Sequence, residues 1–121
     1  MNIRVNVQLR DRDGDKFMGP GPYTLLKKVE EFGSIRQAAL EMGMSYAKAH
    51  NILKKLESML GFKLMDKYIG GAQHGGSELT EEARAFLKAY EKIVSRVNAE
   101  AQAAFADFCI ELKAVSEEHN S

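Results

Sequence analysis

The sequence predicts a mainly α fold of the α+β class, with a short N-terminal hairpin, three helices, a strand–loop–strand and one long final helix. Apolar residues alternate with polar ones at the start of the chain and then recur at steps of three and four, which are the periods of a strand and of a helix. Gly-containing turns separate the helical stretches. The 121 residues allow one domain plus an appendage.

Composition excludes several classes of protein. Hydrophobic residues make up 45% and charged residues 28%, which is typical of a globular protein and not of a disordered or collagen-like chain. No run of about 18 apolar residues and no secretory signal is present, so we expect a cytoplasmic protein without a membrane partner. Cys109 is the single cysteine, which excludes an internal disulfide, and the spacing of His and Cys predicts no metal or cofactor site.

The start of the chain predicts a β-hairpin. Residues 3–9 alternate apolar and polar side chains, as in a strand with one buried face. Residues 11–15 are rich in Asp and predict a turn, and residues 16–18 predict the returning strand. Residues 19–22, Gly-Pro-Gly-Pro, end the hairpin, and Pro22 suits the first turn of a helix.

Two helices follow in close succession. From Tyr23, apolar residues recur at helical spacing for roughly three turns, and Gly33 ends this helix. Ser34 is followed three residues later by Gln37, which is the form of a capping box, so the second helix starts at once and runs to Gly43. Glycine allows the positive φ that a sharp turn between helices needs.

The third helix, from the Ser45 cap to Gly61, has two contrasting sides. On a wheel with about 100° per residue, its inner side carries Ala49, Ile52, Leu53 and Leu56. Its outer side carries short, polar and basic residues, namely Ala47, Lys48, Asn51, Lys54, Lys55 and Ser58. Such a side suits a DNA major groove, although a merely solvated helix face has the same composition.

A strand–loop–strand comes after the third helix. Residues 63–69 and 77–79 predict the two strands, and the Gly-rich residues 70–76 predict the loop between them. Glycine loops also cradle phosphates in nucleotide-binding proteins, but the Gly-Lys-Ser/Thr of a P-loop does not follow here. We therefore interpret the loop as a tight turn and not as a nucleotide site.

The last helix is predicted over residues 80–115, with Thr80 as its cap and a frayed tail from Ser116. A helix of this length spans about 54 Å, too long to cover only its own small core. A break near Asn98 or Gln102 that folds it back is the alternative to a homodimer. In the homodimer, apolar residues at steps of three and four form the seam, namely Leu87, Tyr90, Val94, Val97, Ala101, Phe105 and Phe108.

This order of elements is that of a winged helix-turn-helix, in which the strand–loop–strand forms the wing. We expect residues 1–79 to form a DNA-binding domain and residues 80–121 a dimerisation helix. Residues 20–79 carry eight basic and six acidic side chains, whereas residues 80–121 carry five and eight. The basic excess lies in the predicted DNA-binding part and is small, so we expect two subunits to bind DNA together.

Several short motifs occur in a fixed order between about residues 3 and 95. They are Gly19-Pro20-Gly21, Leu25-Leu26, Phe32-Gly33-Ser34-Ile35, Ala38-Ala39, Gly43-Met44-Ser45-Tyr46, Ala49, and the wing glycines 70, 71, 75 and 76 before Leu79-Thr80. In this order they resemble the N-terminal DNA-binding domain of the ModE family of molybdate-responsive regulators and, more loosely, the LysR-type helix-turn-helix.

The resemblance implies a bacterial or archaeal transcriptional regulator that dimerises through its helices and binds a palindromic operator in double-stranded DNA. Ala47, His50 and Ala72 differ from residues common in the family, which implies a different operator. The molybdate-binding domains of the family would follow residue 121, so the resemblance carries no molybdate site and no effector domain to this chain.

Candidate DNA contacts fall into three groups. The groove candidates are Ser45, Tyr46, Ala47, Lys48 and Asn51; Lys48 suits guanine and Asn51 adenine, unless both contact phosphate or water, and Tyr46 is expected to be half-buried. The phosphate candidates are Arg36, Lys54, Lys55, Lys63 and Lys67. The wing candidates are Gly70, Gly71, Gln73, His74 and Gly75.

Two other functional classes compete with a regulator. A winged-helix module that binds another protein through the last helix is the alternative. An enzyme is not expected, because the sequence shows no nucleophile–base set, no metal-ligand spacing and no cofactor motif.

Overall fold

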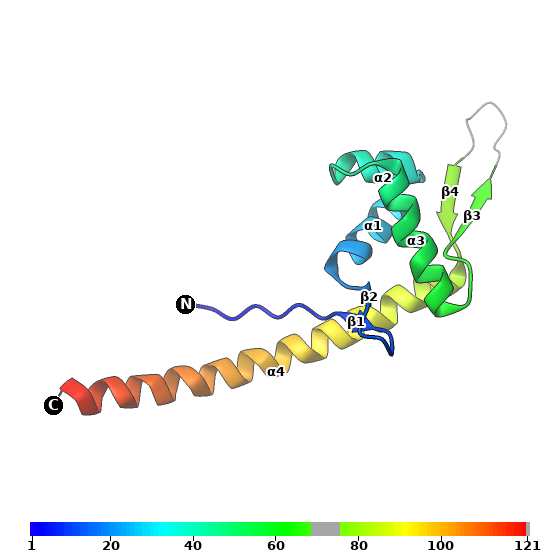
Figure 1. The fold of residues 1–121 in the computed structure, drawn as a ribbon. Coiled ribbons are helices and arrows are strands. Elements are labelled where there is room, and N and C mark those ends of the chain that lie inside the picture. The colour runs from blue at the N-terminus through cyan, green and yellow to red at the C-terminus, as the bar shows by residue number, and fades with distance from the viewer. Residues whose placement is uncertain (69–75, 121) are drawn as a thin grey trace. The chain divides into compact units, whose positions relative to one another are not determined.

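The computed structural model describes residues 1–68 and 76–120, apart from the side chains of Lys67, Tyr68 and Asn120 (Figure 1). Its elements are, in chain order, β1 (Leu9–Arg10), β2 (Lys16–Met18), α1 (Pro20–Phe32), α2 (Ile35–Glu41), α3 (Tyr46–Leu60), β3 (Met65–Tyr68), β4 (Gly76–Leu79) and α4 (Glu81–Asn120). The predicted winged helix-turn-helix of a mainly α fold is confirmed.

The chain forms two compact units, one of Gln8–Ala89 and one in which Met1–Val7 accompanies Tyr90–Ser121. The Gln8–Ala89 unit holds α1, α2, α3, both hairpins and the start of α4. Every one of these elements or its flanking residues places side chains in the core: Met18, Leu25, Leu26, Val29, Ala38, Ala49, Leu53, Leu56, Leu64, Leu79, Ala83 and Leu87. The core thus holds α3 by its inner side.

Small residues and a glycine turn set the angle between α2 and α3. Ala38 of α2 and Ala49 of α3 are completely buried, and the two helices pack against each other. Gly43 lies between them with φ +68°, a conformation that costs a side-chain-bearing residue about 1 kcal/mol or more. The N–H of Met44 then donates to the carbonyl of Ala39 at 3.0 Å, which closes the turn.

The glycine that ends α1 and the serine caps of α2 and α3 are confirmed, whereas α2 ends at Glu41, before the expected Gly43. Gly33 has φ +65° and donates its N–H to the carbonyl of Val29 at 2.8 Å. The Oγ atoms of Ser34 and Ser45 each accept a hydrogen bond at 3.1 Å from the backbone three residues later. The Gln37 side chain extends along α2 to Glu41 at 3.5 Å, so it does not complete a capping box. α1 begins at Pro20, earlier than expected, with Pro22 in its first turn.

Hydrogen bonds join the base of the wing to the neighbouring helices. β3 and β4 pair antiparallel from Met65 opposite Leu79 to Tyr68 opposite Gly76. The N–H of Ser77 donates to the carbonyl of Gly33 at 2.9 Å. The Thr80 hydroxyl donates to the carbonyl of Lys63 at 2.7 Å and accepts from the N–H of Ala83 at 3.0 Å, so it caps α4 as predicted.

The prediction of an N-terminal strand over residues 3–9 is wrong for most of that range. Only Leu9–Arg10 pairs with β2, and residues 1–8 run as an extended segment. The alternation still governs burial, because Ile3, Val5 and Val7 are half-buried between exposed neighbours. The apolar side of Met1–Val7 lies along α4 in place of a sheet, and the Tyr90 hydroxyl donates to the carbonyl of Val7 at 2.7 Å (Figure 1).

α4 is a single helix of 40 residues. The frayed tail from Ser116 and the alternative break near Asn98 or Gln102 are therefore both wrong. Asp and Glu in its first turn, Glu81 and Glu82, complement the positive end of the helix dipole. Across the described part of the chain, no helix combines the length and apolarity needed to cross a membrane.

Candidate nucleic-acid interface

The outer side of α3 is presented to solvent. Its predicted members are all exposed, namely Ala47, Lys48, Asn51, Lys54, Lys55 and Ser58, whereas Ala49, Leu53 and Leu56 on the inner side are buried. We call these six exposed residues the outer face. It contains three cations, one amide and no carboxylate.

The beginning of α3 holds an additional cation. The guanidinium carbon of Arg36 lies 4.6 Å from the centroid of the Tyr46 ring. A cation over an aromatic ring at an exposed site is worth about 0.5–1 kcal/mol. Tyr46 is 37% exposed and so more open than the expected half-burial, and the contact of its ring with Arg36 keeps that charge beside the helix N-terminus. The sequence placed both residues among the candidates but did not predict that they touch.

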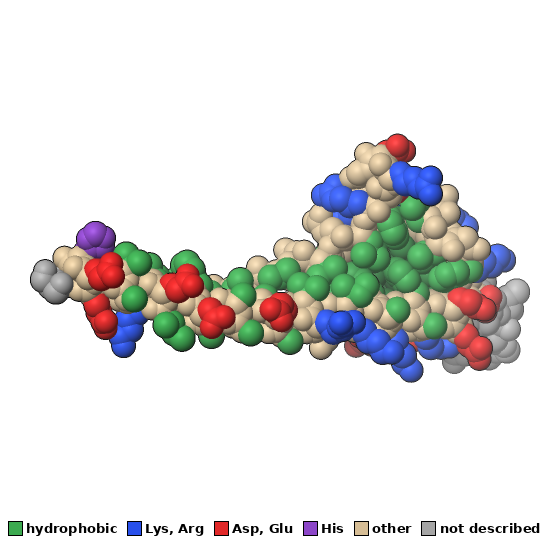
Figure 2. Space-filling model, turned by 90° about the horizontal axis from the view of Figure 1, so that it is seen from below, with side chains coloured by type: hydrophobic (Ala, Val, Ile, Leu, Met, Phe, Trp, Pro, Cys, Tyr) green, Lys and Arg blue, Asp and Glu red, His purple; other side chains and the backbone are tan. Residues whose placement is uncertain are grey.

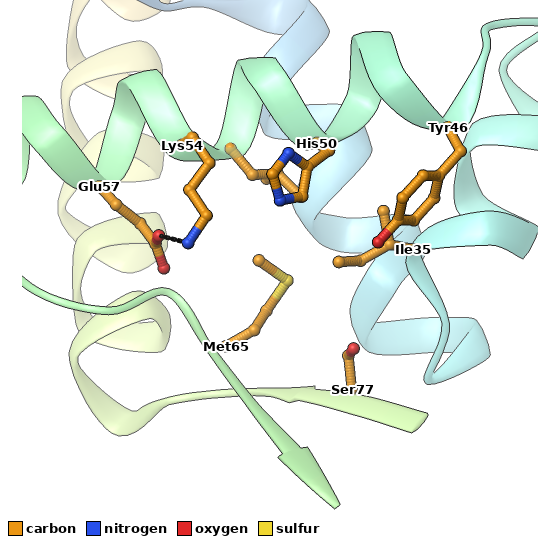
Figure 3. A pocket seen from close by; sticks show the side chains of 8 residues that line it. Ile35, Tyr46, His50, Lys54, Glu57, Met65 and Ser77 are labelled. Atoms are coloured by element: carbon orange, nitrogen blue, oxygen red, sulfur yellow. Dashed lines mark ion pairs between the residues drawn. The ribbon is translucent and has the colours of Figure 1, made fainter. Parts of the chain in front are cut away.

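A small cavity separates α3 from the wing strands (Figure 3). Its volume is about 90 Å³, and Tyr46, His50, Lys54 and Glu57 line it from α3 while Met65 and Ser77 line it from β3 and β4. Ligand pockets for small molecules measure about 300–1,000 Å³. The cavity therefore does not suit a small-molecule effector.

Lys54, on the wing side of the outer face, forms an ion pair with Glu57. Its Nζ lies 3.3 Å from Oε1 of Glu57, drawn as a dashed line in Figure 3. Oε2 of Glu57 accepts the N–H of Leu64 at 2.8 Å, which ties the end of α3 to the approach of β3. Among the phosphate candidates, Lys54 is consequently partly neutralised, whereas Lys55 has no ion pair with a described carboxylate.

The remaining DNA candidates are only partly described. Lys63 is exposed, and its backbone carbonyl is the acceptor for Thr80. The side chain of Lys67 and the five wing candidates lie outside the described residues, namely Gly70, Gly71, Gln73, His74 and Gly75. Lys16, at the start of β2, was not among the sequence candidates but lines a groove beside the outer face.

The predicted dimer seam needs a correction. Leu87 and Tyr90 are each only 3% exposed, because the chain itself encloses them, and they offer no surface to a second copy. Val94, Ala101 and Phe105 are half-buried on the side of α4 that is continuous with Tyr90. Val97 and Phe108 are the seam members that remain exposed.

An apolar stripe on α4 contains these two exposed residues. At about 100° per residue, its members fall within roughly 60° of the helix circumference, where Glu111 interrupts them, and they are Ile93, Val97, Ala104, Phe108 and Val115. Apolar side chains emerge between acidic ones along this part of α4 in Figure 2. We call these five residues the α4 stripe.

Among the described residues, no three His, Cys, Asp or Glu side chains are grouped so that they could hold a metal ion.

Comparisons with known proteins agree with this architecture. Residues 23–84 match the family described as "Bacterial regulatory helix-turn-helix protein, lysR family". The chain is 33% identical over 75 residues to the transcriptional regulator ModE of Haemophilus influenzae, covering 62% of this chain and 29% of that protein. It is 28% identical over 93 residues to ModE of Yersinia pestis, covering 77% and 34%. The chain thus spans about a third of the length of these relatives.

Two solved structures share the fold. One is the crystal structure of a complex of the CbnR DNA-binding domain with DNA, with a TM-score of 0.55, 24% identity and coverage of 72% of this chain and 94% of that one. The other is VV2_1132, a LysR family transcriptional regulator, with a TM-score of 0.51, 19% identity and coverage of 66% and 26%. Because the family match spans about half of the residues, from Tyr23 through the wing to the first turn of α4, the chain belongs to the LysR family of bacterial regulatory helix-turn-helix proteins.

Proposed function

We propose that this protein is a homodimeric transcriptional regulator that binds double-stranded DNA sequence-specifically with the outer face of α3. The observation that carries the proposal is that this face is exposed, cationic and free of carboxylates, while the opposite side of α3 is locked into the core. A rigid helix with such a side fits the major groove, which is about 12 Å wide and admits an α-helix. The relatives that share its family are regulators, which supports the same role.

The outer face offers distinct chemical groups to DNA. Asn51 is central on the face, and its amide suits the N6 and N7 atoms of adenine. Lys48 suits either guanine or a backbone phosphate, and Lys55 a phosphate. The Ser45 hydroxyl accepts the N–H of Lys48, so the phosphate that this helix N-terminus suits would bind the N–H groups before it, those of Tyr46 and Ala47.

A second copy of the chain is the proposed occupant of the α4 stripe, with α4 serving as the dimerisation helix expected for residues 80–121. Phe108 is 49% exposed and its neighbour in the stripe, Val115, is 50% exposed. Apolar side chains repeated at helical spacing over six turns are the pattern of a helix that packs on another helix. Two outer faces would then meet DNA about 34 Å apart, one helical turn of the duplex.

The competing function is a protein-interaction module that uses the α4 stripe for a different protein. The two functions differ in whether the biological role requires the side chains of the outer face. If DNA binding is the function, the cations and Asn51 of α3 are required; if protein binding is, they are dispensable.

The test is equilibrium binding to random-sequence duplexes of about 30 base pairs, three turns of DNA, at several salt concentrations. We expect binding at low salt that weakens steeply as salt rises, because each phosphate contact releases a counterion. The double variant Lys48→Ala with Lys55→Ala should bind more weakly, whereas Lys88→Gln, which removes an exposed cation of α4, should bind like the wild type. Absence of binding at low salt, or binding that is insensitive to both salt and the double substitution, would refute the proposed function.

A further inference from the structure

A groove of about 350 Å³ runs along one flank of the outer face, within the Gln8–Ala89 unit. β2 packs against α3 at this flank. Lys16 borders the groove from β2, and Lys48 and Lys55 border it from α3. The other flank of α3, about 100° or more around the helix, faces the wing with Lys54 and His50.

The groove is cationic at its rim and apolar in its floor. The three lysines are exposed, none of the groove residues is acidic, and in the described chain none of the three has an ion pair. Other lysines of the same unit do form ion pairs with carboxylates, as Lys54 does with Glu57. Three like charges around one recess repel one another, so an anion placed between them is stabilised by all three.

Apolar side chains support the lysines from below. Phe17, Met44 and Ile52 also line the groove and are half-buried, whereas the lysines are exposed. Lysine stems pack along such surfaces while the ammonium groups stay at the rim. None of these three side chains carries a negative charge that would neutralise the lysines.

The spacing of the lysines matches an extended polyanion better than a single small ion. Lys48 and Lys55 are seven residues apart, which places them about two turns and 10 Å apart along α3 and on the same side within about 20°. Lys16 faces this row from a different element. A helix seated in a major groove has a sugar-phosphate strand on each flank, and phosphates follow one another along each strand.

We propose that the β1–β2 hairpin is part of the DNA interface, and that Lys16 binds a backbone phosphate on the hairpin flank of α3 together with Lys48 and Lys55. This inference rests on the proposed function and deepens it. It assigns Lys48 to the backbone and leaves base reading to Asn51. The β1–β2 hairpin would then lie on one side of α3 and the wing on the other, both beside DNA.

The experiment compares Lys16→Gln with Lys88→Gln, which removes the same charge from an exposed position of α4. Each protein is titrated with the random-sequence duplexes of about 30 base pairs over about 50–200 mM salt. One phosphate contact contributes about 0.9 to the slope of log K against log salt. Lys16→Gln should reduce the magnitude of the slope by about 0.9 per protomer, Lys88→Gln should leave it unchanged, and Lys16→Arg should restore it.

The outcomes separate this inference from the proposed function. Because the Lys16 side chain is exposed, the thermal melts of the variants should coincide with that of the wild type. A slope for Lys16→Gln equal to that of Lys88→Gln, or a loss that Lys16→Arg does not restore, would overturn the hairpin contact while leaving DNA binding intact. If the wild type binds no duplex at any salt, both proposals fail.

Discussion

At the scale of single residues, backbone geometry fixes the position of α3 and side-chain chemistry determines what it can bind. Ser45 and Gly43 act on the backbone, the first by capping α3 and the second by turning the chain at φ +68°. Asn51, Lys48 and Lys55 act through their side chains, which the core leaves exposed. Substitutions in the first group should change folding, and those in the second only binding.

Gly43→Ala should lower the free energy of unfolding by about 1–2 kcal/mol, because alanine is strained in the left-handed conformation although the space around a new Cβ is empty. Gly21→Ala is the matched control, since its Cβ would also meet nothing within 4 Å but its φ is not positive. We expect a smaller loss in the control, because the steric cost of a Cβ before Pro22 is partly offset by the better helix propensity of alanine. Urea denaturation of the three proteins measures this, and equal losses in both variants would contradict the assigned role of Gly43.

Asn51→Ala should relax the preference for one base pair of the operator by about 1–3 kcal/mol, because the proposed bidentate contact to adenine is lost. Lys55→Ala should weaken all sequences alike, since a phosphate contact carries no sequence information. Competition among operators with single base-pair changes separates the two effects. A uniform loss for Asn51→Ala would remove it from base reading.

The sequence predicted the outer face of α3 correctly because helical periodicity determines which residues share a side. It did not predict the contact of Arg36 with Tyr46 or the position of Lys16 beside Lys48. These pairs come from different elements, and their proximity arises only when α2 and β2 pack on α3. Within one element spacing is sufficient, whereas between elements the tertiary packing decides.

At the scale of elements, the N-terminal segment shows how a correct pattern led to a wrong assignment. Alternation over residues 3–9 predicted one buried face, and Ile3, Val5 and Val7 are indeed half-buried. The partner of that face is a helix, α4, and not a second strand beyond Leu9–Arg10. Alternation reports the burial of one side of an extended chain and contains no information about what covers it.

Tyr90→Phe should loosen the N-terminal segment, because the hydroxyl of Tyr90 donates to the carbonyl of Val7 at 2.7 Å. The loss in the free energy of unfolding should be about 1 kcal/mol at neutral pH. Hydrogen exchange of residues 3–8 should rise in the variant. Unchanged exchange would show that this hydrogen bond does not hold the segment on α4.

The same residue predicts a pH dependence. Burial raises the pKa of Tyr90 above its ordinary value of 10.0, because the charged phenolate is desolvated. The fold therefore prefers the protonated ring, so this contribution is complete below the pKa of the unfolded chain and is lost as pH rises through the higher pKa of the folded state. The stability difference between wild type and Tyr90→Phe should shrink above about pH 10, and a difference that grows with alkaline pH would contradict it.

At the scale of the whole molecule, the proposed function needs two copies of the chain. The α4 stripe is an exposed apolar surface, and the small basic excess of the DNA-binding part makes a single outer face a weak ligand for DNA. Two linked faces bind with an affinity that exceeds that of either by a factor of about 10²–10⁴. The long helix was predictable from its apolar repeat, but Leu87 and Tyr90 were misassigned to the seam because their repeat serves the protomer's own interior.

Phe108→Asp should convert the proposed dimer into a monomer, because it removes the largest apolar side chain of the α4 stripe and adds a second carboxylate three residues before Glu111, where burial and like-charge repulsion both oppose association. Ala106→Asp is the matched control, since it adds the same charge at an exposed position nearly opposite the stripe on the helix. Sedimentation equilibrium should show half the mass for the first variant and an unchanged mass for the second. A wild type that is already monomeric, or a dimer in both variants, would show that the α4 stripe is not a dimer interface.

The most direct test of the central claim, that α3 reads DNA through two copies of its outer face, is selection of bound duplexes from a random-sequence pool. The account predicts an enriched motif with two-fold symmetry, with half-sites one turn or about 34 Å apart, that is lost with Asn51→Ala and reduced to a half-site with Phe108→Asp. A pool with no enriched motif, or an asymmetric motif that survives both substitutions, would contradict it.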